Sequence, residues 1–171
     1  MSRETAVPSQ ARAFVERRRA RICEAVGRAL LPAGPDAAPL PADRLEFCRR
    51  EAEDLYWNEL EWEELTDEEA IQGGHLTELV FPGFLAFVEG LLVEKVPADA
   101  ISPARPHPDA VEAILGFLGE RHAELAAELE AGVDSQRVVW ARAMTARLID
   151  LVLYRLYGLT PAQQEQAEQG D

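Results

Sequence analysis

The chain contains few of the residues that usually build a chemical site. Its 171 residues include two cysteines, three histidines and a single lysine, Lys95, beside sixteen arginines. The spacing of Cys23 and Cys48 fits neither a disulfide framework nor a zinc site. Each falls on the apolar face of an expected helix. We therefore expect two buried thiols in a reducing compartment.

Several motifs that mark enzymes or membrane proteins are also absent. The pair Gly73-Gly74 lacks the spacing and the lysine of a phosphate-binding loop, and no serine stands in a nucleophile elbow. The strongest apolar run, 148–157, is too short to cross a bilayer. No apolar segment follows the opening residues, so we expect no signal peptide and a cytoplasmic protein. The sequence indicates no cofactor and carries no catalytic signature, which argues against an enzyme without excluding one.

Acidic residues, by contrast, are abundant. The net charge is −14, which disfavours direct binding to nucleic acid or to an anionic membrane, because both require a basic surface. The charge is uneven along the chain. Residues 1–30 carry a net charge of +4 and residues 43–69 a net charge of −9. These two segments are expected either to pair with each other or to face different partners.

The apolar periodicity predicts an all-α fold without strands. We expect one domain over residues 1–171, a bundle of about five helices. The termini, 1–8 and 161–171, are expected to be frayed. The other predicted elements are helices at 9–30, 43–65, 66–96 (broken at Gly73-Gly74 or Pro82-Gly83), 109–131 and 135–157, and proline-rich loops at 31–42 and 97–108.

The bundle is expected to form around the helix at 135–157. Between Leu148 and Tyr157 apolar side chains point almost all the way round, and only Asp150 and Arg155 interrupt them. A helix that is apolar on every side must be covered by other elements. This segment is therefore predicted to be central to the core.

Helix ends can also be read from the sequence. Gly132 and Gly158 stand where helices are expected to stop, with Gly158 at the C′ position. The pairs Asp43/Glu46 and Thr160/Gln163 have the spacing of capping boxes.

The close of the last long helix, Leu-Tyr-Gly-Leu-Thr-Pro at 156–161, resembles the C-terminal tails of some type II adenine-specific DNA methyltransferases. The resemblance is confined to this short tail. The methyltransferase catalytic motifs are absent, and a helix stop followed by a capped helix produces the same letters. The resemblance therefore implies no function.

Some polar side chains fall on faces that should be buried. Glu59 and Glu63 lie on the inner arc of the helix at 43–65, and His122 lies in a seam of aliphatic residues at 109–131. Arg142 and Thr145 share one side of the next helix. Two structural explanations are open. These polar side chains form a cluster in the core and satisfy one another's charges and hydrogen bonds, or the last turn of the helix at 43–65 is exposed to solvent. The alternative is a metal-binding helical bundle that uses Glu59, Glu63 and His122, although the Glu-x-x-His pairs of di-iron bundles are absent.

The acidic run from Glu59 to Glu69 follows Trp57, which lies off the inner arc. A solvated helix face is the default interpretation. The run can also form a docking surface for a protein, because an exposed tryptophan among charges is a common interface anchor. Mimicry of DNA, to inhibit a DNA-binding protein, is a third interpretation. The candidate partner-binding residues are Trp57, Glu61, Glu64, Asp67 and Glu68.

Together these observations predict a small acidic helical accessory protein. It is expected to bind a partner protein or to pair with itself as a homodimer, because much apolar surface lies on 76–96 and 135–157. Neither nucleic acid nor membrane is an expected partner. The metal-binding bundle and the DNA mimic are the alternatives.

Overall fold

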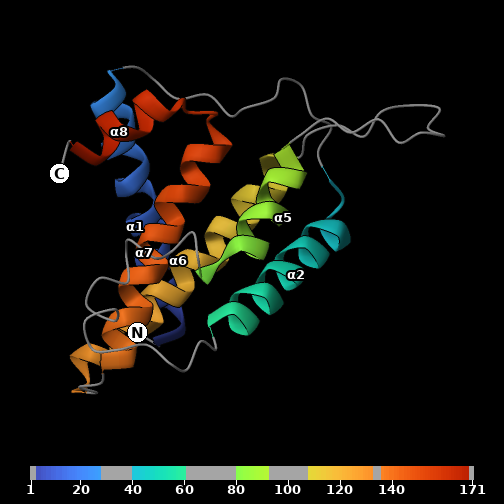
Figure 1. Cartoon of the computed structure of the whole chain (residues 1–171). Coiled ribbons are helices and arrows are strands. Elements are labelled where there is room, and N and C mark those ends of the chain that lie inside the picture. Colours follow the sequence, from blue (N-terminus) through green and yellow to red (C-terminus); the bar gives the residue numbers. More distant parts are fainter. Residues whose placement is uncertain (1–2, 28–39, 61–79, 93–107, 133–135, 170–171) are drawn as a thin grey trace.

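The computed structural model describes residues 3–27, 40–60, 80–92, 108–132 and 136–169, and shows six helices there (Figure 1). The described residues contain no strand, so the predicted all-α class is confirmed. Six helices are described where about five were expected. They are α1 (Arg3–Val26), α2 (Ala42–Leu60), α5 (Pro82–Leu92), α6 (Pro108–Glu130), α7 (Gln136–Leu156) and α8 (Pro161–Gln169).

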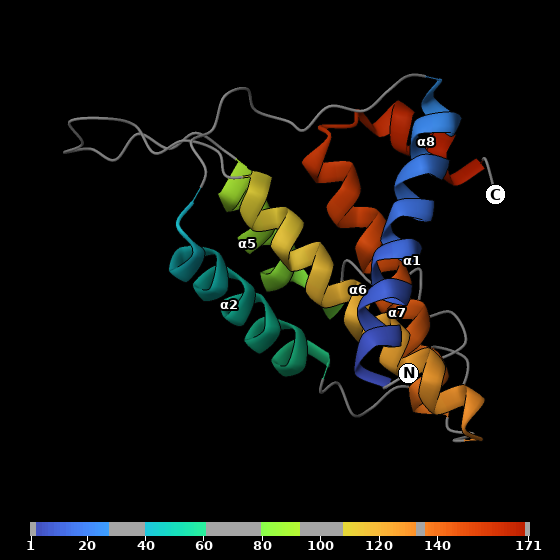
Figure 2. The same ribbon diagram turned by 180° about the vertical axis from the view of Figure 1, so that it is seen from behind.

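One hydrophobic core joins all six helices, and α6 runs through the middle of the arrangement. It packs against α1 and α7 on one side and against α2 and α5 on the other (Figure 2). The expected central helix, α7, packs against α6, α5 and α1. Among the described helices α7 has the most buried side chains, but α6 packs against more of the other helices. The centre of the bundle is therefore the α6–α7 pair.

The C-terminal half of α7 is covered on all sides, as its sequence predicts. From Leu148 to Tyr157 only Arg155 is not buried. The two charged residues of this segment each form an ion pair with another helix. Asp150, 2% exposed, accepts hydrogen bonds from Arg18 of α1, with 2.8 Å between Arg18 Nε and Asp150 Oδ1. Arg155 Nε donates to Glu89 of α5 at 2.7 Å.

The predicted aliphatic seam of α6 is also buried. Leu118 and its seam neighbours are enclosed, and only Leu129 at the C-terminal end is partly exposed. Gly119, beside the seam, allows α1 to approach closely. A Cβ atom at this position would lie 2.8 Å from the carbonyl oxygen of Ala11. A larger residue would push the two helices apart.

Two predicted helix ends form as expected. Gly132 and Gly158 have positive φ angles of 89° and 61°, a conformation that costs glycine little. After α7 the amide of Gly158 bonds the carbonyl of Arg155 at 3.2 Å, and the amide of Leu159 bonds that of Tyr154 at 3.0 Å. This pair of bonds is a Schellman motif.

The capping box at the start of α8 also forms. The Thr160 amide donates to Gln163 Oε1 at 2.9 Å, and the Gln163 amide to Thr160 Oγ1 at 3.2 Å. The capping box and the preceding Schellman motif explain the amino-acid sequence at 156–161 by local helix-end geometry. The helix that follows packs against α1 and buries Ala167, where we expected a frayed tail.

Other boundaries differ from the expectation. Helix α1 begins at Arg3, before the expected start at residue 9, and ends at Val26, after which Gly27 has a φ angle of 70°. Helix α2 begins at Ala42, so Asp43 lies in its first turn, and Glu46 accepts a hydrogen bond from Arg50 at 3.0 Å. The expected break at Pro82-Gly83 is confirmed, because α5 starts at Pro82 after a non-helical Phe81.

Among the described residues, the acidic partners of the basic helix α1 do not lie on α2. Arg18 pairs with Asp150 of α7. Arg19 binds Glu112 of α6 through both terminal nitrogens, at 2.9 and 2.8 Å, and also contacts Tyr157. On α2, Arg49 pairs with Glu120 of α6. The ion pairs thus attach both helices to the α6–α7 pair.

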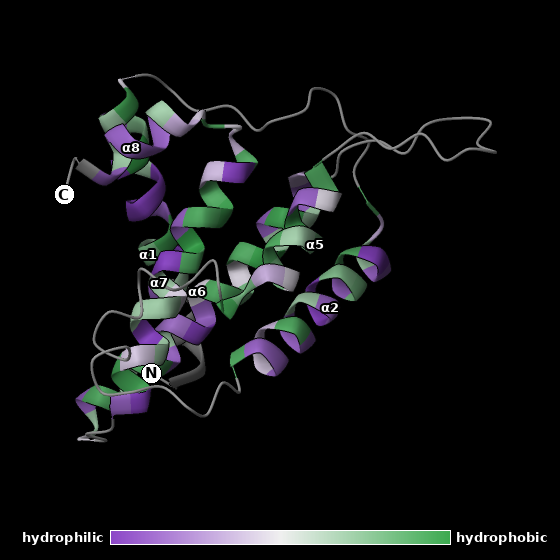
Figure 3. Cartoon of the chain, viewed as in Figure 1, coloured by the Kyte–Doolittle hydropathy of each residue, from purple (hydrophilic) through white to green (hydrophobic). Residues whose placement is uncertain are grey.

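Hydropathy varies along the helices in keeping with this packing. Figure 3 shows hydrophilic and hydrophobic bands alternating along α2, which covers the outer side of the bundle. Cys48 of α2 is buried, as expected, whereas Cys23 of α1 is partly exposed, contrary to the expectation of a buried thiol. Among the described helices none combines the length and apolarity needed to span a bilayer.

Candidate functional site

A groove of about 320 Å³ lies where α2, α6 and α7 meet. Its apolar lining is formed by Trp57 and Leu60 of α2, Leu125 of α6, and Val138 and Ala141 of α7. Its charged lining consists of Arg121, Glu128 and Arg137. The groove therefore combines an apolar floor with charges of both signs.

Trp57 forms one wall of this groove and is 45% exposed. The guanidinium carbon of Arg121 lies 4.6 Å from the centre of the indole, a cation–π contact. Arg121 Nη1 also donates to Glu124 at 3.1 Å. Trp57 thus has one face held by Arg121 while nearly half of its surface remains accessible.

The position of Trp57 follows from the register of α2. Cys48, Ala52, Tyr56 and Leu60 are buried at intervals of four residues. Trp57 is one residue beyond Tyr56, so it is rotated by about 100° from this inner row. The predicted location off the inner arc agrees with its observed exposure.

Polar contacts join α2 to α7 at the groove. The hydroxyl groups of Tyr56 and Thr145 are 2.9 Å apart, and Thr145 Oγ1 donates to the carbonyl of Ala141 at 2.6 Å. At the end of α2, Arg137 donates to the carbonyl of Leu60 at 3.4 Å. These contacts join α2 to α7 at the groove and give its walls a defined spacing.

Glu59 has a structural partner outside the groove. Its Oε1 accepts from the amide of Gly83 at 2.6 Å and its Oε2 from the amide of Phe84 at 3.1 Å. These amides belong to the first turn of α5 and have no partner within the helix. Glu59 therefore caps α5, and its negative charge suits that helix end.

His122 has a different set of neighbours. It is 7% exposed and stacks on Phe14 of α1, with ring centres 3.8 Å apart and planes inclined by 13°. Burial, followed by the charges of Arg142, Arg18 and Arg17, lowers its pKa to about 4. The imidazole is therefore neutral at pH 7.

These neighbours separate the residues of the predicted polar cluster. Glu59 contacts α5 and is not among the charges that act on His122, while Arg142 is exposed and Thr145 is buried against Tyr56. Glu63 lies outside the described residues. Within the described part of the chain, no three His, Cys, Asp or Glu side chains are grouped as metal ligands.

The other candidate partner-binding residues cannot be added to the groove. Glu61, Glu64, Asp67 and Glu68 lie outside the described residues. Sequence reasoning identified Trp57 but missed Arg121, Leu125, Arg137 and Val138. Pairing α2 with α6 and α7 was needed to find them, because no pattern within one helix shows which other helix it meets.

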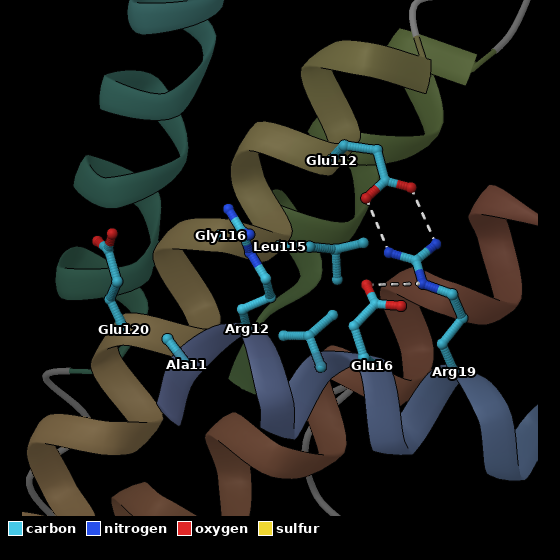
Figure 4. A pocket seen from close by; sticks show the side chains of 9 residues that line it. Ala11, Arg12, Glu16, Arg19, Glu112, Leu115, Gly116 and Glu120 are labelled. Atoms are coloured by element: carbon cyan, nitrogen blue, oxygen red, sulfur yellow. Dashed lines mark hydrogen bonds and ion pairs between the residues drawn. The ribbon is translucent and has the colours of Figure 1, made fainter. Parts of the chain in front are cut away.

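A second groove, of about 280 Å³, lies between α1 and α6 (Figure 4). Arg19 closes one end through its hydrogen bonds to Glu112, and Arg12 extends from α1 towards α6 near Gly116. A Cβ atom built on Gly116 would have no neighbour within 4 Å. Arg19 and Glu112 of this lining already neutralise each other, so the Trp57 groove is the stronger candidate for a binding site.

Comparisons with known proteins supply no relative for this chain. No protein-family model matches the sequence, and neither does any curated protein or any solved structure. The function must therefore be argued from the fold and from the groove itself.

Proposed function

We propose that the chain is a small helical interaction protein, and that its α2–α6–α7 groove binds an amphipathic helix of a partner protein. The observation that carries this proposal is the half-exposed Trp57, stacked by Arg121 at the edge of an apolar groove. Tryptophan and arginine are the residues most enriched among the energetic centres of protein interfaces.

The lining of the groove defines the chemistry of the partner. Leu60, Leu125, Val138 and Ala141 offer aliphatic contacts, which suit one or two apolar anchor side chains. Arg137 and Glu128 carry opposite charges beside them. An amphipathic helix supplies apolar anchors on one face and charges of both signs at its margins.

The polar contacts between α2 and α7 at the groove also support a binding role. The Tyr56–Thr145 hydrogen bond and the Arg137–Leu60 contact fix the spacing of α2 and α7 before any partner arrives. A preformed groove loses little conformational entropy on binding. We place this interaction in the cytoplasm, in keeping with two cysteines that are not joined by a disulfide.

The alternatives gain less support from the described residues. Glu59 caps α5, and no metal-ligand group of three is present in the described part. On α2, Glu46 and Glu53 each pair with an arginine of the same helix, so this part of the acidic segment is partly neutralised. A phosphate-backbone mimic requires carboxylates free to meet a basic surface.

The test is capture of partners from the native host followed by binding of the purified partner to the full chain. Trp57→Ala should weaken that binding by about 2–4 kcal/mol, as for the central residue of an interface. Phe47→Ala is the matched control, because Phe47 is a 54% exposed aromatic residue on the same helix but outside the groove lining. It should change binding by less than about 0.5 kcal/mol. Isothermal titration calorimetry measures both values.

Equal binding by the wild type and Trp57→Ala would refute the groove as the site. Sedimentation of the chain alone at several concentrations tests the occupant. If the chain associates with itself and Trp57→Ala abolishes that association, the occupant is a second copy and the proposed partner helix is wrong. Circular dichroism should show that both variants stay folded.

A further inference from the structure

The charged side chains that line the Trp57 groove differ in how well their charges are matched within the protein. The side chain of Arg121 is only 14% exposed, stacks on Trp57 and donates to Glu124 at 3.1 Å. Arg137 donates to the carbonyl of Leu60 at the C-terminal end of α2, where the helix dipole favours a cation. Both arginines of the lining are therefore held by groups of the chain itself.

Glu128 is the charged residue of this lining that has no such match. Arg121, Leu125 and Glu128 follow one another on α6 at intervals of four and three residues, so they face the groove together. Glu128 is partly exposed and forms no ion pair within the described residues. Glu124 lies one turn before it, and carboxylates at this spacing repel each other. A cation from outside the chain would relieve that repulsion.

A second carboxylate without a partner lies beside Trp57 on α2. Asp54 precedes Trp57 by three residues, so the two side chains are neighbours on the surface of the helix. Asp54 is exposed and, like Glu128, takes part in no ion pair in the part of the chain that the structure describes. The whole chain has a net charge of −14, which attracts a cationic partner from a distance.

We propose that the helix bound in the Trp57 groove is basic. This inference rests on the proposed function and narrows it to one class of partner. The apolar face of the partner helix lies on the aliphatic floor of the groove, and a lysine or arginine at its margin pairs with Glu128. A second cation lies near Asp54, beside Trp57. An acidic helix would bring its carboxylates towards these two unmatched charges and would be repelled.

The experiment uses two model peptides of about 18 residues, long enough to form a helix on binding. Both have the same leucine face, and their charged positions are lysine in one and glutamate in the other. Fluorescence anisotropy of the labelled peptides measures their binding to the full chain. The lysine peptide should bind saturably and about tenfold more tightly than the glutamate peptide, because two exposed carboxylates attract the first and repel the second.

Reversal of one charge tests the assignment of Glu128. Glu128→Lys should weaken binding of the lysine peptide about tenfold and strengthen binding of the glutamate peptide. Glu165→Lys is the matched control, because Glu165 is an exposed carboxylate of α8 outside the groove lining and the substitution changes the net charge equally. It should change both affinities by less than about twofold, since salt screens distant charges. Circular dichroism should show that both variants stay helical.

Trp57→Ala distinguishes failure of this inference from failure of the proposed function. Both peptides share the leucine face, so this substitution should weaken the binding of either one. If the lysine peptide binds Trp57→Ala as tightly as the wild type, the general acidity of the chain holds it, and the basic helix in the groove is refuted.

Other outcomes refute the basic partner and leave the groove in place. These are equal binding of the two peptides or tighter binding of the glutamate peptide, when Trp57→Ala weakens both. Equal effects of Glu128→Lys and Glu165→Lys would also overturn the inference. So would failure of both peptides to bind at millimolar concentration, whereas the groove itself is refuted only when Trp57→Ala leaves binding of the native partner unchanged.

Discussion

Helix α6 is packed closely against α1 at Gly119 and is open towards α2 and α7 at Leu125. Towards α1, a Cβ atom on Gly119 would lie 2.8 Å from the Ala11 carbonyl oxygen and 2.9 Å from Val15. Towards α2 and α7, Leu125 of the same helix forms part of a groove of about 320 Å³. Interaxial distance depends on the side chains at the crossing. Gly119 lets α1 approach α6 closely. On the other side of α6, the stacked side chains of Trp57 and Arg121 lie at the edge of the groove.

The comparison assigns stability and the proposed binding to different faces of one helix. On the closed side the buried His122 stacks on Phe14 of α1, and next to this stack the Arg18–Asp150 pair joins α1 to α7. The open side keeps Trp57 accessible. Substitutions on the closed side should change the free energy of unfolding most, and substitutions on the open side should mainly change binding.

The largest expected effect contrasts two leucines of the α6 seam. Leu118 is fully enclosed, so Leu118→Ala should lower the free energy of unfolding by about 3–5 kcal/mol. Leu125 lines the groove, so the space left by Leu125→Ala opens to water and the loss should be about 2–3 kcal/mol. Urea denaturation of both variants measures the difference. Equal losses would show that the groove floor is packed as tightly as the seam.

The next effect concerns His122 and the dependence of stability on pH. The folded protein holds the His122 pKa near 4, below its usual 6.5, so the unfolded chain binds more protons between these values. His122 should therefore contribute about 2–3 kcal/mol of stability that is present above pH 6.5 and lost as the pH falls to 4. Denaturation at a series of pH values measures this loss.

His122→Phe is the control for that measurement. The new ring can still stack on Phe14 but cannot be protonated, so its stability should fall less steeply over the same pH range. All other titrating groups are common to both proteins, and the difference in slope isolates His122. Identical slopes would mean that His122 is as accessible to water as a residue on the open side.

The smallest effect compares two glycines of α6. Gly119→Ala should cost about 1–3 kcal/mol, because its Cβ meets the backbone of α1. Gly116→Ala, which meets nothing within 4 Å, should stabilise the protein by about 0.5–1 kcal/mol by favouring the helix. Thermal unfolding of the two variants checks the opposite signs. A loss from Gly116→Ala would show that the α1–α6 groove is narrower than described.

Several features controlled by neighbouring residues were predicted correctly, although the starts of α1 and α2 were not. The capping box of Thr160 and Gln163, the helix end at Gly158 and the break at Pro82 each depend on a few adjacent residues. The seam around Leu118 depends on periodicity within one helix. Glycine conformation, proline geometry and helical spacing act locally, so a single sequence contains this information.

Contacts between helices were predicted poorly. Glu59 was expected to meet His122 or Arg142 but caps α5, and the arginines of α1 pair with α6 and α7 where the acidic segment at 43–69 had been one expected partner. The charge and hydropathy of a residue show that it needs a partner, but they do not identify that partner. Many partners satisfy a carboxylate almost equally well, so the choice depends on the packing of the whole chain.

The residues alone specify an acidic helical protein with a buried segment at 148–157, because apolar periodicity and helix-end residues require no knowledge of distant contacts. Only the tertiary structure brings Trp57, Arg121 and Leu125 to one groove, and Phe14 and His122 into one stack. These groups come from different helices, and their meeting depends on how closely the helices pack. Between α1 and α6, for example, that distance is limited where Gly119 meets Ala11, two residues far apart in the sequence.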